Sequence, residues 1–212
     1  MNSTVLADKI EQTLLKDTYD LNLDSVRDLN QALHSKDLVN EIAHWTVKNP
    51  AGIHNIAVGI KAPISVTIDG HAGYYCAGMN QEADIVVNGN VGVGVAENMM
   101  SGSVRIKGNA SQAAGATAHG GLLVIEGDAG ARCGISMKGV DIVVGGNIGH
   151  MSCFMGQAGR LVVCGDAGDA LGDSLYETRI YVKGAVKFLV SDSFEKKIGA
   201  KLFAELAELL PK

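Results

Sequence analysis

SVTIDG at residues 65–70 is the first of seven short apolar segments that each end in glycine. The others are IVVNG (85–89), VRIKG (104–108), LVIEG (123–127), IVVGG (142–146), LVVCG (161–165) and IYVKG (180–184). The seven final glycines are spaced by 19 residues, without insertion or deletion: Gly70, Gly89, Gly108, Gly127, Gly146, Gly165 and Gly184. Self-similarity at a fixed period is typical of a repeat architecture.

Each repeat predicts a strand followed by a corner. The residues two and four positions before every one of these glycines are aliphatic, for example Ile85 and Val87. This alternation predicts a strand with one buried face. Asn or Asp follows the glycine in five repeats, and both residue types tolerate a left-handed backbone and form local turn bonds. We therefore predict a corner at which glycine takes a positive φ, so that Gly127→Val is destabilising.

The rest of each repeat predicts a second strand and a further turn. Six residues past the corner stand mostly small, apolar residues, interpreted as the inward side of a second short strand: Cys76, Val95, Ala114, Cys133, Ser152 and Leu171. Thirteen residues past it, glycines at Gly102, Gly121 and Gly159 indicate a third turn. A unit of 19 residues is too short for a strand and a crossover helix, whereas stacked coils bury each other's edges.

The predicted fold class is therefore an all-β core, a single-stranded right-handed parallel β-helix of about seven 19-residue coils with helical N- and C-terminal caps. The right-handed sense follows from the general preference of parallel crossovers. We assign residues 1–45 to a helical N-terminal cap, 46–190 to the β-helix and 191–212 to a C-terminal amphipathic helix. That last helix would serve as a cap or as a docking helix for a partner. Its apolar face would consist of Phe194, Ile198, Leu202, Leu206, Leu209 and Leu210.

Composition excludes several classes of protein. The formal net charge of −5 lacks the basic excess of a nucleic-acid binder, and no apolar run is long enough for a membrane span. The first residues contain acids and do not resemble a signal peptide. The four cysteines, Cys76, Cys133, Cys153 and Cys164, show no CxxC spacing, which favours buried thiols in a reducing compartment. We expect a cytoplasmic protein that binds neither nucleic acid nor membrane.

None of the motifs predicts a reaction or a ligand site, so we predict no catalytic, cofactor-binding or metal-binding residue. GNVGVG at 89–94 returns to a strand instead of opening a long helix, which favours coil corners over a phosphate loop. His71, His119 and His150 occupy different positions of the repeat. Cys133 and Cys153, on adjacent coils, are expected to point to opposite sides. The run from Glu97 to Met100 interrupts the repeat, through either core filling or a partner surface.

Three stretches carry a family resemblance. Residues 70–121, residues 127–177 and RDLNQALH at 27–34 resemble the GXGXG β-helix domain at the C-terminal end of the glutamate synthase large subunit, over roughly residues 25–190. In that family the domain is a right-handed β-helix that holds catalytic domains together and lacks catalytic residues. The resemblance therefore implies a non-catalytic structural subunit of a multi-subunit, FMN-dependent enzyme.

Four motifs resemble the small β-helix subunits of N-methylglutamate synthases (methylamine–glutamate N-methyltransferases), which convert methylamine and glutamate to N-methylglutamate and ammonia. They are HWTVKNPAGIHNIAVGI (44–60), YYCAGMN (74–80), GVAENMMSG (94–102) and ARCGISMKGVDIVV (131–144). This likeness implies a hetero-oligomer with a class II amidotransferase-like subunit and an FMN-binding glutamate synthase-like subunit. The FMN and an iron–sulfur cluster are expected in that partner and none in this chain.

Other interpretations remain open at the level of sequence. One is the small subunit of a split, archaeal-type glutamate synthase. Another is the β-helix subunit of formylmethanofuran dehydrogenase or of the related formyltransferase/hydrolase complex. A third is a free-standing scaffold or binding protein.

Overall fold

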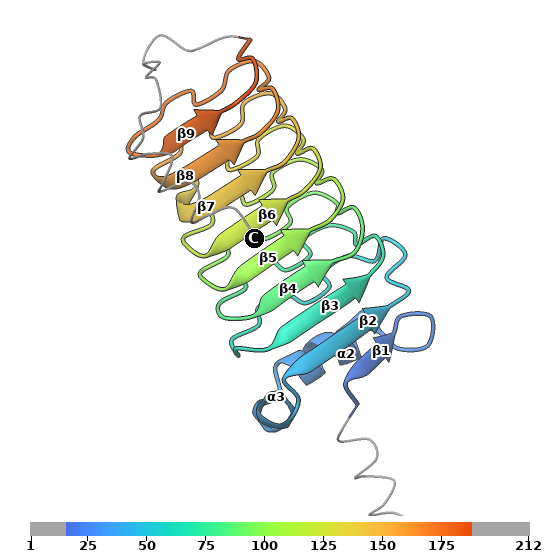
Figure 1. Ribbon diagram of the computed structural model, residues 1–212. Helices are drawn as coiled ribbons and strands as arrows, with labels where there is room; N and C mark the ends of the chain where they lie inside the picture. Colours follow the sequence, from blue (N-terminus) through green and yellow to red (C-terminus); the bar gives the residue numbers. More distant parts are fainter. Residues whose placement is uncertain (1–15, 188–212) are drawn as a thin grey trace, which may run out of the picture.

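The computed structural model describes residues 16–187, which form a rod built on one parallel sheet (Figure 1). Nine strands follow one another in the sheet in the order of the chain, so every strand pairs with its sequence neighbours. They are β1 (Thr18–Asp20), β2 (His44–Lys48), β3 (Ser65–Asp69), β4 (Asp84–Val87), β5 (Ser103–Ile106), β6 (Leu122–Ile125), β7 (Lys138–Val144), β8 (Ala158–Val163) and β9 (Arg179–Val182). The predicted parallel β-helix of about seven coils, β3 to β9, is confirmed.

Strand register reproduces the 19-residue period. Val66 pairs with Ile85 and Ile85 with Val104, and the same offset continues to β9. These inward-facing aliphatic side chains are fully or almost fully buried from β3 to β8 and form the core. In Figure 1 the strands run to the right across the near face and the chain returns behind them while the coils rise, which is the predicted right-handed sense.

The predicted second strand is wrong. Only one residue per coil makes a second parallel pairing, in a column that runs from Ala72 to Val186. Beyond it, positive φ recurs at alternate positions, as at Tyr75, Ala77 and Met79. A strand has negative φ throughout, so this conformation is not a strand. We call residues 74–79 and their equivalents (93–98, 112–117, 131–136, 150–155 and 169–174) the alternating segments.

The alternating segments bond to the coils on both sides. The N–H of Tyr75 donates to Val93 O on the next coil at 2.8 Å, and that of Ala77 donates to Ile56 O on the previous coil at 2.9 Å. Stacking thus satisfies backbone groups that an isolated turn of this conformation leaves to water. The inward residues predicted for this part of the coil are confirmed as buried: Cys76, Val95, Ala114, Cys133, Ser152 and Leu171.

Corner glycines are required for close approach rather than for positive φ. Of the seven, only Gly70 has a positive φ, +139°, so the conformation predicted for Gly127 is wrong. A Cβ built on Gly127 would collide with Asn109 Oδ1 and would lie 2.9 Å from Gly108 O. The predicted third turn is confirmed, since Gly102 has a φ of +81°.

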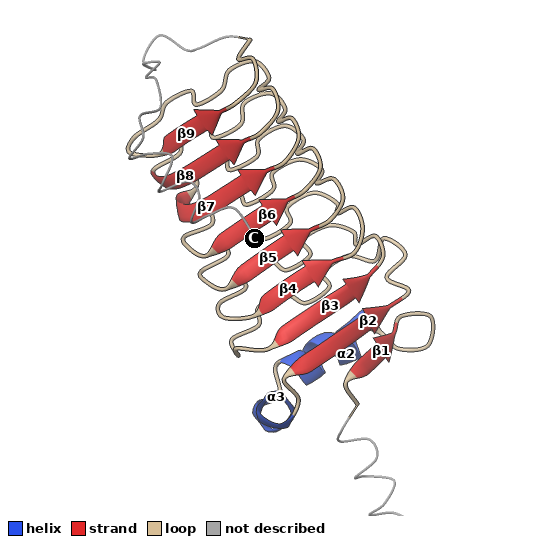
Figure 2. Ribbon diagram, in the orientation of Figure 1, coloured by secondary structure: helices blue, strands red, loops and turns tan. Residues whose placement is uncertain are grey.

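The N-terminal end is a mixed cap. Residues 1–45 were predicted helical, but β1 adds a strand to the sheet there, and β2 begins at His44. Helices α2 (Val26–Leu33) and α3 (Lys36–Glu41) lie between these strands at this end of the rod (Figure 2). Residues 1–15 of the predicted N-terminal cap and the helix predicted at 191–212 lie outside the described residues.

Helix α2 closes the first coil. Its N-cap Ser25 accepts a 3.1 Å hydrogen bond from the N–H of Asp28. From the helix, Asn30 Nδ2 donates to Asn55 O at 2.7 Å, and His34 Nε2 lies 2.8 Å from Val58 O. The helix therefore supplies the first coil with side-chain partners for backbone carbonyls.

Candidate functional site

A polar ladder follows the corner along the rod. The side chain one residue past each corner accepts a hydrogen bond from the N–H of the equivalent residue one coil later, at 2.6–2.8 Å. The ladder, named here the corner ladder, consists of His71, Asn90, Asn109, Asp128, Asn147 and Asp166, and it ends at the N–H of Ala185. These bonds fix the register of successive coils at their corners.

The segment GNVGVG belongs to this backbone network and does not form a phosphate loop. The N–H of Val91 donates to Asn109 O at 2.9 Å, that of Gly92 to Ala72 O at 3.0 Å and that of Gly94 to Gln112 O at 3.0 Å. Amide groups already bonded between coils are not free to cradle a phosphate. The predicted coil corner is therefore confirmed.

The three histidines weighed as a shared metal site stay apart on the surface. His71 heads the corner ladder, where its Nδ1 accepts from Asn90, whereas His119 and His150 are exposed at other positions of their coils. Within residues 16–187, no group of three or more His, Cys, Asp or Glu side chains is placed to hold a metal ion.

Three of the four cysteines are core residues. Cys76, Cys133 and Cys153 are fully buried, and all four cysteines, including the half-buried Cys164, are free thiols. Burial raises the pKa of Cys76 and Cys133 to about 12, and burial with the neighbouring Cys133 raises that of Cys153 to about 12. Protonated, enclosed thiols are poor nucleophiles and poor metal ligands.

Cys133 and Cys153 do not point to opposite sides of the coil, as their positions in a strand had predicted. Both are buried in the same core, and Cys153 Sγ lies 3.5 Å from Met137 Sδ. The reason is the positive φ of Cys153, +60°, which abolishes the side-to-side alternation of a strand.

The run from Glu97 to Met100 contains both a core residue and an exposed one. Met99 is fully buried and fills the core, whereas Met100 is 44% exposed. Met100 is one of several large apolar side chains that are exposed on or just after the alternating segments. These residues, named here the tyrosine–methionine surface, are Tyr74, Tyr75, Met79, Met100, Met155 and Tyr176.

The tyrosine–methionine surface has features of a protein-binding surface. Tyrosine and methionine are enriched at the centres of interfaces, and methionine adapts to a partner's shape. Tyr74 is also held in place, because its ring stacks on His54 at 4.5 Å between centroids and its N–H donates to His54 Nδ1 at 2.9 Å. A side chain ordered before binding loses less entropy when a partner docks.

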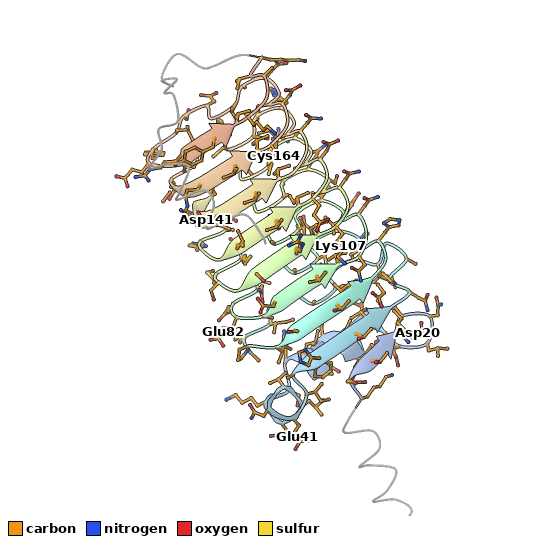
Figure 3. The ribbon with its side chains drawn as sticks, viewed as in Figure 1. Asp20, Glu41, Glu82, Lys107, Asp141 and Cys164 are labelled. Carbon is orange, nitrogen blue, oxygen red and sulfur yellow. The ribbon has the colours of Figure 1, made fainter. Side chains whose placement is uncertain are left out.

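Polar and charged side chains lie along the two sides of the sheet at which the strands begin and end. In Figure 3, Lys107 and Cys164 lie along the edge where the strands end, and Glu82 and Asp141 along the edge where they begin. Asp141 accepts two hydrogen bonds from Arg160 on the next strand, at 2.6 and 2.8 Å. This partly buried pair supports the register of the two neighbouring coils.

Comparison with known proteins gives one strong similarity. The chain is 60% identical over 193 residues to "Protein GlxC" of Rhizobium meliloti (strain 1021), and the match spans 91% of this chain and 85% of that protein. No family model matches the chain. No solved structure matches it either. Among residues 16–187, no helix has the length and apolar character that crossing a bilayer requires.

Proposed function

The chain belongs to the family of Protein GlxC, and on this premise we propose that it is a non-catalytic, structural β-helix subunit of a multi-subunit enzyme related to glutamate synthase. The observation that carries the proposal is the rod itself. Its backbone amides are bonded from coil to coil, three of its thiols are sealed in the core, and six of the seven large apolar side chains exposed among residues 16–187 lie on or just after the alternating segments. These features suit a surface that holds other proteins.

The enzyme we infer is an N-methylglutamate synthase, which joins methylamine to the glutamate skeleton. Support comes from the four motifs that resemble this group, and the structure gives each a position in the rod. YYCAGMN and GVAENMMSG, for instance, contribute Tyr74, Tyr75, Met79 and Met100 to the tyrosine–methionine surface. Two of the four motifs therefore contain four of the six residues of the tyrosine–methionine surface.

In this proposal the chemistry takes place on two partners. A class II amidotransferase-like subunit would release the amine, and an FMN-binding glutamate synthase-like subunit would supply the redox chemistry that joins it to the glutamate skeleton. The rod would orient the two so that a small reactive intermediate passes between them without loss to water. Buried thiols with pKa values near 12 are unsuited to ligate an iron–sulfur cluster, which is consistent with the cluster residing in the partner.

We further infer that the complex works in the cytoplasm. Free cysteines persist where the cell keeps thiols reduced, and the described part of the chain holds four free thiols and no disulfide.

Affinity capture of the native complex, followed by mass determination of its members, tests this assignment. We expect an amidotransferase-like and an FMN-binding subunit in constant stoichiometry. Capture of formyltransferase subunits would instead assign the chain to a one-carbon complex, and capture of a single glutamate synthase-type subunit would favour the split glutamate synthase. A chain recovered alone at physiological concentration would contradict the proposed role.

A further inference from the structure

The outward face of the sheet carries a strip of apolar side chains that are buried although they point away from the core. Val124, Val143, Val162 and Tyr181 occupy equivalent positions on β6 to β9, where side chains point away from the core. They form a cluster separate from the core, named here the outer strip. Each is only 3–9% exposed, although residues at the same position on β3 to β5 are half-buried. An outward side chain reaches such low exposure only under a cover.

The described elements do not supply this cover. Helices α2 and α3 are the helices of residues 16–187, and they lie at the opposite end of the rod, beside β1 and β2 (Figure 2). The strip also ends abruptly toward that end, because the next equivalent residue is Arg105, which pairs with Glu126 at 2.7 Å. The apolar surface is therefore confined to the last four strands.

Residues 188–212 have the sequence to fill this role. Strand β9 ends at Val182, and Lys187, which precedes the segment, lies five residues later. The segment therefore starts at the end of the rod that carries the outer strip. Phe194, Ile198, Leu202, Leu206 and Leu209 recur at spacings of three and four, the pattern of a helix with one apolar face.

The dimensions agree. Four strands spaced about 4.8 Å apart place the first and last residues of the strip about 14 Å from each other. From Ile198 to Leu209, eleven residues further along the chain, an α-helix advances about 16 Å, at 1.5 Å per residue. One helix with this apolar face is thus long enough to lie across all four strands.

We propose that the C-terminal segment of this chain, residues 188–212, docks on the outer strip of the same chain as an amphipathic helix. Packing of a helix on the outer face of a parallel sheet is a common way to bury such a face.

The test is thiol labelling of Val143→Cys in the full-length chain with Cys164→Ser as background. Cys76, Cys133 and Cys153 should not react with the label while the core is intact, because they are buried and protonated. We expect the Val143→Cys thiol to react at least tenfold faster once Leu202→Asp and Leu206→Asp are added. The milder pair Leu202→Ala and Leu206→Ala, which keeps helix propensity, should accelerate labelling less and guards against loss of the fold.

Thr67→Cys is the matched control, since Thr67 occupies the same position on β3, beyond Arg105. Its labelling rate should not respond to either pair of substitutions. The proposal is overturned if Val143→Cys labels as fast as Thr67→Cys in the otherwise unchanged chain, or if the leucine substitutions leave its rate unaltered. If the Val143→Cys thiol is protected from labelling only at high protein concentration, a second copy of the chain supplies the cover. That result would also overturn the proposal.

Discussion

Asn109 Oδ1 accepts a 2.8 Å hydrogen bond from the backbone N–H of Asp128, the residue that stands at the same place one coil later. Asn109 also donates its own N–H to Asn90 Oδ1 at 2.8 Å. The side chain therefore lies flat against the next corner, in the space that a Cβ on Gly127 would occupy. The corner ladder and the corner glycine are one structural unit, and the glycine is needed because the ladder is there.

Gly127→Val should lower the free energy of unfolding by about 3 kcal/mol, because the new side chain meets Asn109 Oδ1 and the backbone of Gly108. Gly52→Ala is the comparison, since Gly52 has a φ of +76° but a Cβ added there would meet no atom within 4 Å, and it should lose only about 1 kcal/mol through backbone strain. Urea unfolding of both variants measures the difference. Equal losses would show that close approach does not matter.

Asn147→Asp should destabilise the rod more than Asn90→Asp. Asn147 lies between Asp128 and Asp166 in the corner ladder, so its replacement puts three carboxylates in a row, whereas Asn90 lies between His71 and Asn109. Like charges directly opposite on neighbouring strands cost roughly 0.5–1 kcal/mol. The gap between the urea midpoints should close in about 1 M salt, where screening acts within roughly 3 Å. A salt-independent gap would argue against charge repulsion.

Stability should fall as the pH rises above about 9. The folded pKa of Cys133 is raised to about 12 from 9.0, so the folded chain holds a proton that the unfolded chain releases between these values. The stability linked to this thiol is thus fully present below pH 9 and is lost progressively toward pH 12. Thermal melting of Cys133→Ala should decline less steeply in this window than that of the unchanged chain. Parallel declines would mean that the thiol titrates normally.

Met100→Asp combined with Met155→Asp should release the partner subunits. Both methionines are exposed on the tyrosine–methionine surface, at 44% and 40%, so charges there leave the isolated chain's melting temperature nearly unchanged. We expect recovery of partners in affinity capture to drop at least tenfold. Leu23→Asp, at an 86% exposed site before α2, is the control and should retain them. Full recovery with the methionine pair would place the interface elsewhere.

Sequence periodicity was sufficient for the coil stack, because each coil from β3 to β9 repeats the same contacts at the same spacing. It did not reveal β1 and β2, since Tyr19 pairs with Val47 at an offset of 28 residues and Val47 with Ile68 at an offset of 21. The helices inserted between β1 and β2 lengthen that coil and remove it from the 19-residue register. Pattern reasoning finds a repeat only where its length is constant.

Conformation within the coil was harder to predict than its length. Small apolar residues such as Cys76 and Ala77 suit a strand and an alternating segment equally well, and only hydrogen bonds to both neighbouring coils select the second. The tyrosine–methionine surface was visible in sequence only at Met100, as an interruption of the repeat. The exposure of Tyr74 and Tyr75 depends on the positive φ of Tyr75, and amino-acid composition does not predict that conformation.

The most direct test of the scaffold role is a measurement of bound flavin and of turnover in the chain purified alone and after partner subunits are added. The proposed role predicts a colourless subunit that is inactive with methylamine and glutamate, and a rate that appears only when both partners are present and rises with the amount of rod supplied. Stoichiometric flavin or turnover in the isolated chain would contradict it.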